Sequence, residues 1–138
     1  EEEEEDEYPL RKSRDYILWE VLPHDEQAFT QGLTFFDGRL YEGTGMNGQS
    51  ELRLMESKTG KILQSRSLPG AYFGEGIAHF VNKDGIDCII QLTYKHLKGF
   101  VYRASDFSTL ETFRFETITK EGWGITYNPE TSEFIVSD

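Results

Sequence analysis

The chain has 138 residues, enough for one modest domain, and its 25 acidic against 14 basic residues give a net charge of -11. This charge, and the lack of a basic stripe, argue against a nucleic-acid partner. No apolar stretch approaches the ~18 residues of a membrane-spanning helix. The single cysteine, Cys88, excludes an internal disulfide, and its apolar run CIIQL predicts a small, buried hydrophobic side chain.

The chain opens with an acidic run, EEEEEDE, in which all seven residues are negatively charged. Such runs are typical of solvated, disordered segments. We therefore predict an acidic disordered leader over residues 1–14 and a folded domain over residues 15–138. The simplest interpretation of the leader is a spacer without a specific partner.

The rest of the chain has the pattern of an all-β fold. Aromatic residues make up 14% of the sequence and gather in short apolar runs bounded by Gly, Asp, Asn and Pro, which is typical of strands and turns. No long stretch has helical periodicity. In chain order, strands are predicted within residues 16–22, 33–43, 52–68, 77–80, 88–94, 99–115 and 124–136.

A repeat connects these strands. FTQGLTFFDGRLYEGTG, FGEGIAHFVNKDGIDCIIQLTYK and EGWGITYNPETSEFIVSD align on Gly32, Gly76 and Gly124, with spacings of 44 and 48 residues. The first two repeats each continue into a third and a fourth strand. Four strands in a period of roughly 40 to 50 residues indicate a β-propeller blade. The alternative is a tandem of unrelated hairpins.

The repeats do not complete a ring. We predict a leading strand over 16–22, blades over 29–68 and 73–115, and the start of a next blade over 121–138, which is about two and a half blades. Propellers close with roughly four to eight blades, and the leading strand is expected to complete the last of them. We therefore expect an N-terminal part of a longer protein, and no stable monomer from residues 1–138 alone.

Matching positions of the repeats predict a site, because the innermost strand of every blade lines the central channel. Gln31, Glu75 and Trp123 precede the aligned glycines, and two residues earlier lie Phe29, Phe73 and Glu121. Glycine allows the backbones to approach closely there. An acid among aromatic rings is partly desolvated, which raises its pKa and suits it to proton transfer. Alternatively, Glu75 pairs with a neighbour and holds blades together.

Five segments carry a family resemblance. LPHDEQAFTQGL (22–33), LYEGTGMNGQSELR (40–53), YFGEGI (72–77), QLTYKHLKGFVY (91–102) and EGWGITY (121–127) resemble the plant and bacterial type of glutaminyl cyclase, in the family's order and at similar spacing. The resemblance implies a five-bladed β-propeller. It also implies an aminoacyltransferase that converts the N-terminal glutamine of peptides to pyroglutamate with release of ammonia, in the secretory pathway or outside the cell.

The resemblance also implies which residues form the active site: Phe29, Gln31, Phe73, Glu75, Tyr94 and Trp123. The repeat alignment selects all of these except Tyr94, which rests on the resemblance alone. The family has Trp in its LTWK motif where this chain has Tyr94, and a phenol has a smaller edge and a differently placed donor. The remaining pocket residues of the family, among them a Trp and a Lys, belong to later blades.

The residue types suit this chemistry. One carboxylate, Glu75, can take a proton from the attacking amine and give it to the leaving nitrogen. Gln31 can hold the substrate by hydrogen bonds, while the aromatic rings grip the glutamine side chain and exclude water. We expect no cofactor, no metal and no covalent enzyme intermediate. We also expect a monomer when the protein is full length, acting on peptides or proteins with N-terminal Gln, and an inactive fragment.

Two rival functions stay open. A non-catalytic propeller could bind peptides through the same aromatic mouth, and Tyr94 is its only support. A metal-dependent propeller hydrolase needs channel carboxylates around calcium, which Gln31 and Trp123 fit poorly. The histidines, for which we expect loop or surface positions, have no zinc-site spacing: they are His24, His79 and His96.

Overall fold

The computed structural model describes residues 16–138, so the predicted leader, 1–14, lies outside the described residues. All regular secondary structure in the described part is β, which confirms the all-β prediction. The first sheet has the order β1-β2-β3-β4, with strands β1 (Thr30–Phe36), β2 (Arg39–Thr44), β3 (Glu51–Met55) and β4 (Ile62–Ser67).

The second sheet repeats this plan and the third begins it. The second has the order β5-β6-β7-β8, with strands β5 (Gly74–Val81), β6 (Asp87–Thr93), β7 (Lys98–Arg103) and β8 (Thr109–Arg114). The third is a hairpin of β9 (Ile125–Asn128) and β10 (Glu133–Val136). Every pair of neighbouring strands is antiparallel. This meander is the plan of a propeller blade.

The first hairpin shows how local sequence sets this plan. Asp37 and Gly38 connect β1 to β2 and both have positive φ, 50° and 71°. A two-residue turn with positive φ at both positions matches the right-handed twist of the strands it joins, and Asp-Gly is among its preferred sequences.

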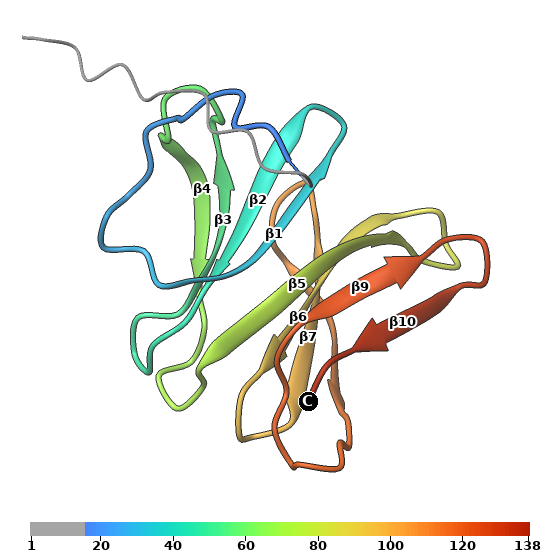
Figure 1. The fold of residues 1–138 in the computed structure, drawn as a ribbon. Coiled ribbons are helices and arrows are strands. Elements are labelled where there is room, and N and C mark those ends of the chain that lie inside the picture. Colours follow the sequence, from blue (N-terminus) through green and yellow to red (C-terminus); the bar gives the residue numbers. More distant parts are fainter. Residues whose placement is uncertain (1–15) are drawn as a thin grey trace, which may run out of the picture.

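The inner strands of the three sheets lie side by side, with β1 next to β5 and β5 next to β9 (Figure 1). The aligned glycines meet where these strands begin. A Cβ added at Gly32 would lie 3.0 Å from the Cα of Gly76, and one added at Gly76 would lie 2.9 Å from the Cα of Gly124. The backbone N–H of Gly76 donates to the carbonyl of Trp123 at 2.8 Å. Neighbouring sheets are thus in backbone contact at the repeat glycine.

We expect Gly76→Ala to destabilise the full-length protein by about 2 kcal/mol, since a methyl group forced against rigid neighbours costs roughly 1–3 kcal/mol. Its Cβ would lie 2.8–2.9 Å from backbone atoms of residues 123–125, which side-chain rotation cannot relieve. Gly70→Ala is the matched control, because its Cβ would meet nothing closer than 3.9 Å. Denaturant unfolding of both variants measures the difference, and equal stabilities would contradict the proposed contact.

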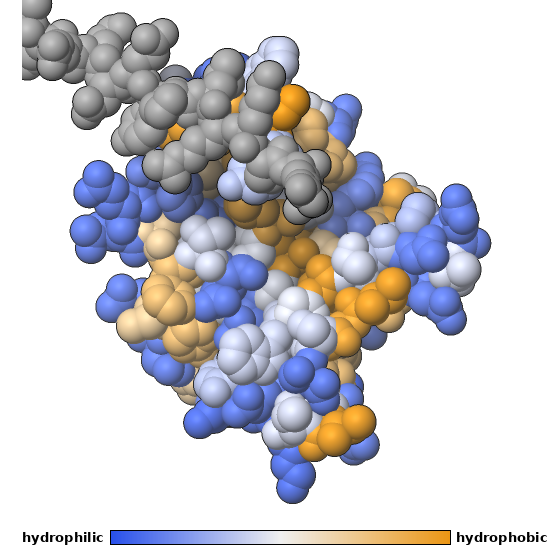
Figure 2. Space-filling view, viewed as in Figure 1, coloured by the Kyte–Doolittle hydropathy of each residue, from blue (hydrophilic) through white to orange (hydrophobic). Residues whose placement is uncertain are grey.

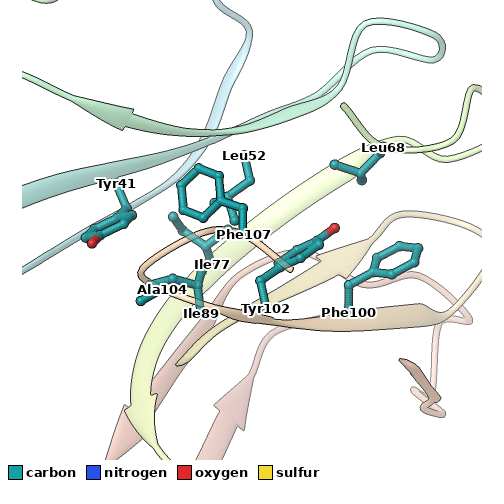
Figure 3. Packing of buried hydrophobic residues seen from close by; sticks show 9 residues of the cluster. All are labelled: Tyr41, Leu52, Leu68, Ile77, Ile89, Phe100, Tyr102, Ala104 and Phe107. Carbon is teal, nitrogen blue, oxygen red and sulfur yellow. The ribbon is translucent and has the colours of Figure 1, made fainter. Parts of the chain in front are cut away.

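Side chains from the first two sheets form the main core between them (Figure 3). Tyr41, Leu52 and Leu68 come from the first sheet and its exit, and pack against residues of the second, among them Ile77 and Ile89. Full burial of such a side chain contributes about 1.5–3 kcal/mol, so this cluster is the main force joining the two blades. A second cluster lies toward the third sheet and contains Cys88, whose predicted burial is confirmed.

Two sequence-based expectations about the strands differ from the structure. Residues 16–22 belong to none of the sheets, and only Ile17 makes an isolated bridge. A strand needs a neighbour for its backbone hydrogen bonds, and no sheet in the described residues provides one. His79 is also not a surface or loop residue: it lies half-buried on β5, stacked on Phe36 with ring centroids 3.6 Å apart, and its Nε2 lies 2.7 Å from Asp87.

One face of the first sheet is uncovered in the described part of the chain. Leu33 and Phe35 of β1 are 58% and 64% exposed, whereas Ile77, the match of Leu33 in β5, is buried against the first sheet. Figure 2 shows apolar side chains over the region of β1 and β5, with hydrophilic residues around them. Among residues 16–138 there is no helix long and apolar enough to cross a membrane.

Candidate active site

An irregularity in the strand pairing lies at the same place in both complete sheets. The β1–β2 register shifts between Thr30 and Gly32, at Gln31, and the β5–β6 register shifts between Gly74 and Ile77, at Glu75 and Gly76. A β-bulge adds one residue to a strand, and this re-aims a side chain. The residue before each repeat glycine is therefore placed by a local break in pairing.

Four aromatic rings form a continuous arc across the three sheets. Phe29 contacts Phe73 edge to face with ring centroids 5.9 Å apart. Phe73 contacts Tyr94 at 5.9 Å, and Tyr94 contacts Trp123 at 5.7 Å, both again edge to face. Edge-to-face pairs at these distances are the favoured aromatic geometry. The structure thus brings together all four predicted site aromatics.

The arc is partly open to solvent. Phe29 and Trp123, its two ends, are 50% and 47% exposed, and the two rings between them are half-buried. Backbone hydrogen bonds hold the arc in place: the N–H of Tyr94 donates to the carbonyl of Phe73 at 3.0 Å, and that of Gly122 to the carbonyl of Tyr94 at 2.8 Å. Exposed rings on a fixed backbone form a surface that can receive a ligand side chain.

Glu75 is buried beside this arc, with 4% of its surface exposed. Burial raises the pKa of its carboxyl group from 4.5 to about 7. Its carboxylate makes no hydrogen bond or ion pair with any other described residue, so the alternative role of holding blades together finds no partner in residues 16–138. A buried, unpaired carboxyl group that titrates near neutral pH is typical of a catalytic acid or base.

Tyr94 links the arc to two carboxylates. Its hydroxyl donates to Oε1 of Glu121 at 3.2 Å. Burial, this hydrogen bond, and the charges of Glu121 and Glu75 raise the pKa of the Tyr94 hydroxyl above its usual value. The phenol therefore stays protonated at neutral pH, and it places a polar group between the two acids.

Gln31 lies on the same side of the first sheet, half-buried at the bulge of β1. It is close to Phe73 because both lie over Gly45. A Cβ added at Gly45 would clash with the Phe73 ring and would lie 3.1 Å from Cγ of Gln31. The absence of a side chain at Gly45 thus lets a ring of the second sheet reach the amide side chain of the first.

A different cavity, of about 510 Å³, lies at the far ends of the inner strands. Its walls include Phe35 of β1, Val81 of β5 and Tyr127 of β9, but no carboxylate. Its only titratable groups are the Tyr127 phenol and the His79 imidazole, and His79 is already engaged by Asp87. The end of the strands that carries Glu75 is therefore the better candidate for acid–base chemistry.

No group of three or more His, Cys, Asp or Glu residues is placed to hold a metal ion within residues 16–138. Glu75 and Glu121 are the acids of the mouth, and Tyr94 lies between them. In this part of the chain, the site offers an acid, an amide and rings rather than a set of metal ligands.

Sequence reasoning missed a buried ionic network behind Phe29. Glu42 on β2 is fully buried and lies directly opposite Arg53 of β3, whose Nη1 is 3.4 Å from its Oε1. Its Oε2 accepts from Thr30 at 2.8 Å and lies 2.5 Å from Nε2 of His24. The opposite charges of Glu42 and Arg53 were a usable signal, but only once the β2–β3 register was known.

Comparisons with known proteins agree with this geometry. Residues 2–138 match the family model of glutamine cyclotransferase. A glutaminyl-peptide cyclotransferase from Arabidopsis thaliana is 33% identical over 105 residues, which are 75% of this chain and 31% of that protein. The chain thus spans about a third of the curated relative that it matches.

Solved structures give the fold. The crystal structure of Myxococcus xanthus glutaminyl cyclase matches with a TM-score of 0.68 and 31% identity, over 85% of this chain and 45% of that one. The WD40 β-propeller domain of Doa1 matches with a TM-score of 0.53 and 13% identity, over 75% of this chain and 31% of that one, and supports the fold alone.

These matches confirm the β-propeller architecture, while the number of five blades stays a prediction. The family model covers nearly the whole sequence, and the structural match includes the sheets that carry the aromatic arc and Glu75. The chain therefore belongs to the glutamine cyclotransferase family.

Proposed function

We propose that the protein containing this chain is an aminoacyltransferase that converts the N-terminal glutamine of peptides or proteins to pyroglutamate and releases ammonia. The observation that carries this proposal is Glu75, a buried carboxyl group without a partner in residues 16–138 whose pKa is about 7, beside an arc of four aromatic rings. Family membership supports the same activity.

The reaction needs one group that can both accept and donate a proton. The α-amine of the substrate attacks its own γ-carboxamide carbon, so a new N–C bond forms and the bond to the amide nitrogen breaks. Glu75 takes the proton from the amine and delivers it to the leaving nitrogen, which departs as ammonia. Because its pKa of about 7 lies near that of a peptide amine, roughly 7.7–8.0, transfer in both directions is nearly balanced in energy.

The other residues position the substrate. The rings of Phe73, Tyr94 and Trp123 offer apolar faces for the methylene groups of the glutamine side chain and exclude water from the reacting atoms. Gln31 offers an amide donor and acceptor for the substrate carboxamide or amine. We propose no covalent intermediate, because attacking and leaving groups belong to the same molecule and proximity is built in.

A non-catalytic peptide-binding propeller would use the same arc of rings. Burying an unpaired carboxylate costs stability, and a site that only binds peptides gains nothing from it, so we prefer catalysis. We also propose that the full-length protein is a monomer of the secretory pathway or the extracellular space, and that residues 1–138 alone are inactive because the channel wall is incomplete.

The test is cyclisation of a Gln-initiated peptide by the full-length protein, followed by ammonia release. We expect turnover, at equal rates with and without a strong chelator after dialysis. We expect rates to fall as pH drops below about 7–8, because protonation of the substrate amine and of Glu75 removes the nucleophile and the base. Loss of turnover with the chelator and its recovery with zinc would replace Glu75 by a metal as the activating group.

A further inference from the structure

A second cavity adjoins the aromatic arc on the first sheet. Its volume is about 320 Å³, at the lower end of the roughly 300–1,000 Å³ of small-ligand sites. Phe29 lines it and is also the first ring of the arc. The cavities of about 510 and 830 Å³ elsewhere are lined by none of the six site residues. A peptide whose first residue lies against the arc could therefore reach this cavity with a later side chain.

The walls of this cavity come from two segments of the first repeat. One is the stretch before β1, residues 27–29, and the other is the β2–β3 connection with the start of β3, including Met46 and Gln49. The connection is held in shape by the hydroxyl of Ser50, which donates to the carbonyl of Met46 at 2.7 Å. The cavity is thus a built feature of the blade and lies outward from the channel.

Acidic groups dominate its charge. Arg53 lines the cavity, but its Nε donates to Glu51 at 2.7 Å and its Nη1 to Asp25 at 3.0 Å and to Glu42 at 3.4 Å. One guanidinium thus faces three carboxylates, which leaves a surplus of two negative charges when His24 is neutral. Arg53 is mostly buried, whereas the side chains of Glu51 and Asp25 keep 28% and 31% of their surface exposed.

These carboxylates are available to a ligand. Oε1 of Glu51, which lines the cavity, has no hydrogen-bond partner in the described part of the chain. The backbone N–H of Gln27, and then Arg53, lower the pKa of Asp25, so this group is ionised at neutral pH. A cationic side chain entering the cavity would meet anionic oxygen atoms at its accessible rim.

We propose that this cavity is a subsite for the substrate, which receives a Lys or Arg side chain from one of the residues that follow the N-terminal glutamine. The inference rests on the proposed function, because only a peptide held at the arc by its first residue presents later residues to the cavity. Glu51 sets the preference for basic residues, and Asp25 assists it.

The experiment compares kcat/KM of the full-length protein for Gln-Ala-Ala-Ala with that for Gln-Lys-Ala-Ala and Gln-Ala-Lys-Ala. At low salt we expect one lysine peptide to exceed the alanine peptide about two- to fivefold, the range of partly exposed ion pairs, with a smaller ratio at high salt. Glu51→Gln keeps an acceptor for Arg53 and should bring the ratio close to one, and Asp25→Asn should reduce it. Glu111→Gln, an exposed residue of β8, is the charge-matched control and should leave it unchanged.

The outcomes separate the two proposals. A ratio near one at both positions, with Gln-Ala-Ala-Ala still cyclised, would overturn the subsite and leave the proposed function standing. A lysine preference that survives Glu51→Gln and Asp25→Asn would also overturn it. If no Gln-peptide is cyclised, both proposals fall.

Discussion

Glu75→Gln should lower kcat of the full-length protein by about 10²–10⁴-fold, the usual contribution of a general acid–base group, and leave KM within a few-fold of the parent. The amide keeps the shape of the carboxyl group and can still hydrogen-bond, but it cannot carry a proton. Steady-state ammonia release gives both constants. The loss corresponds to about 3–5 kcal/mol of activation free energy.

Glu111→Gln is the control for this experiment, because it removes the same charge from an exposed position on the outer strand of the second sheet. It should retain the parent rate. A Glu75→Gln variant within a few-fold of the parent would remove Glu75 from the mechanism, and a large rise in KM with unchanged kcat would make it a substrate-binding residue instead.

The same substitution should make the protein more stable at alkaline pH. In the folded protein the pKa of Glu75 is about 7 instead of 4.5, so above pH 4.5 the unfolded chain releases this proton more readily than the folded one. Folding stability is therefore lost as pH rises from about 4.5 to 7, by about 3 kcal/mol in total. Glutamine carries no charge at any of these pH values and avoids this loss.

Denaturant unfolding at pH 5 and pH 8 measures the effect. We expect Glu75→Gln to exceed the parent by about 3 kcal/mol at pH 8 and by less than about 1 kcal/mol at pH 5. A gain that is the same at both pH values would show that it comes from packing, and no gain at pH 8 would show that the buried carboxyl group has an ordinary pKa. Greater stability with lower activity is the expected signature of a strained catalytic acid.

Much of the site follows from the repeat. Aligning three glycines is enough to select Gln31, Glu75 and Trp123, because every blade presents the same backbone position to the channel. The stacking of Gly32, Gly76 and Gly124 has the same origin. Local patterns of this kind are visible in a sequence because each depends on residues close together in the chain.

Other features depend on contacts between distant segments and could not be predicted in this way. Tyr94 lies at the end of a second strand and joins the arc only because the rings of Phe73 and Trp123 reach it. The network of Glu42, Arg53 and His24 requires the β2–β3 register and the path of the segment before β1. Residues 16–22 have the composition of a strand, but a strand forms only beside a partner.

The glycine contacts between neighbouring sheets have a consequence for how such a site can change. Blade spacing at the channel is set by backbone atoms alone, so it does not depend on which side chain precedes each glycine. Three equivalent positions accordingly hold an amide, a carboxylate and an indole: Gln31, Glu75 and Trp123. Each position works as an interchangeable socket, and a single substitution can give the ring a new reactive group while the distances between sockets stay constant.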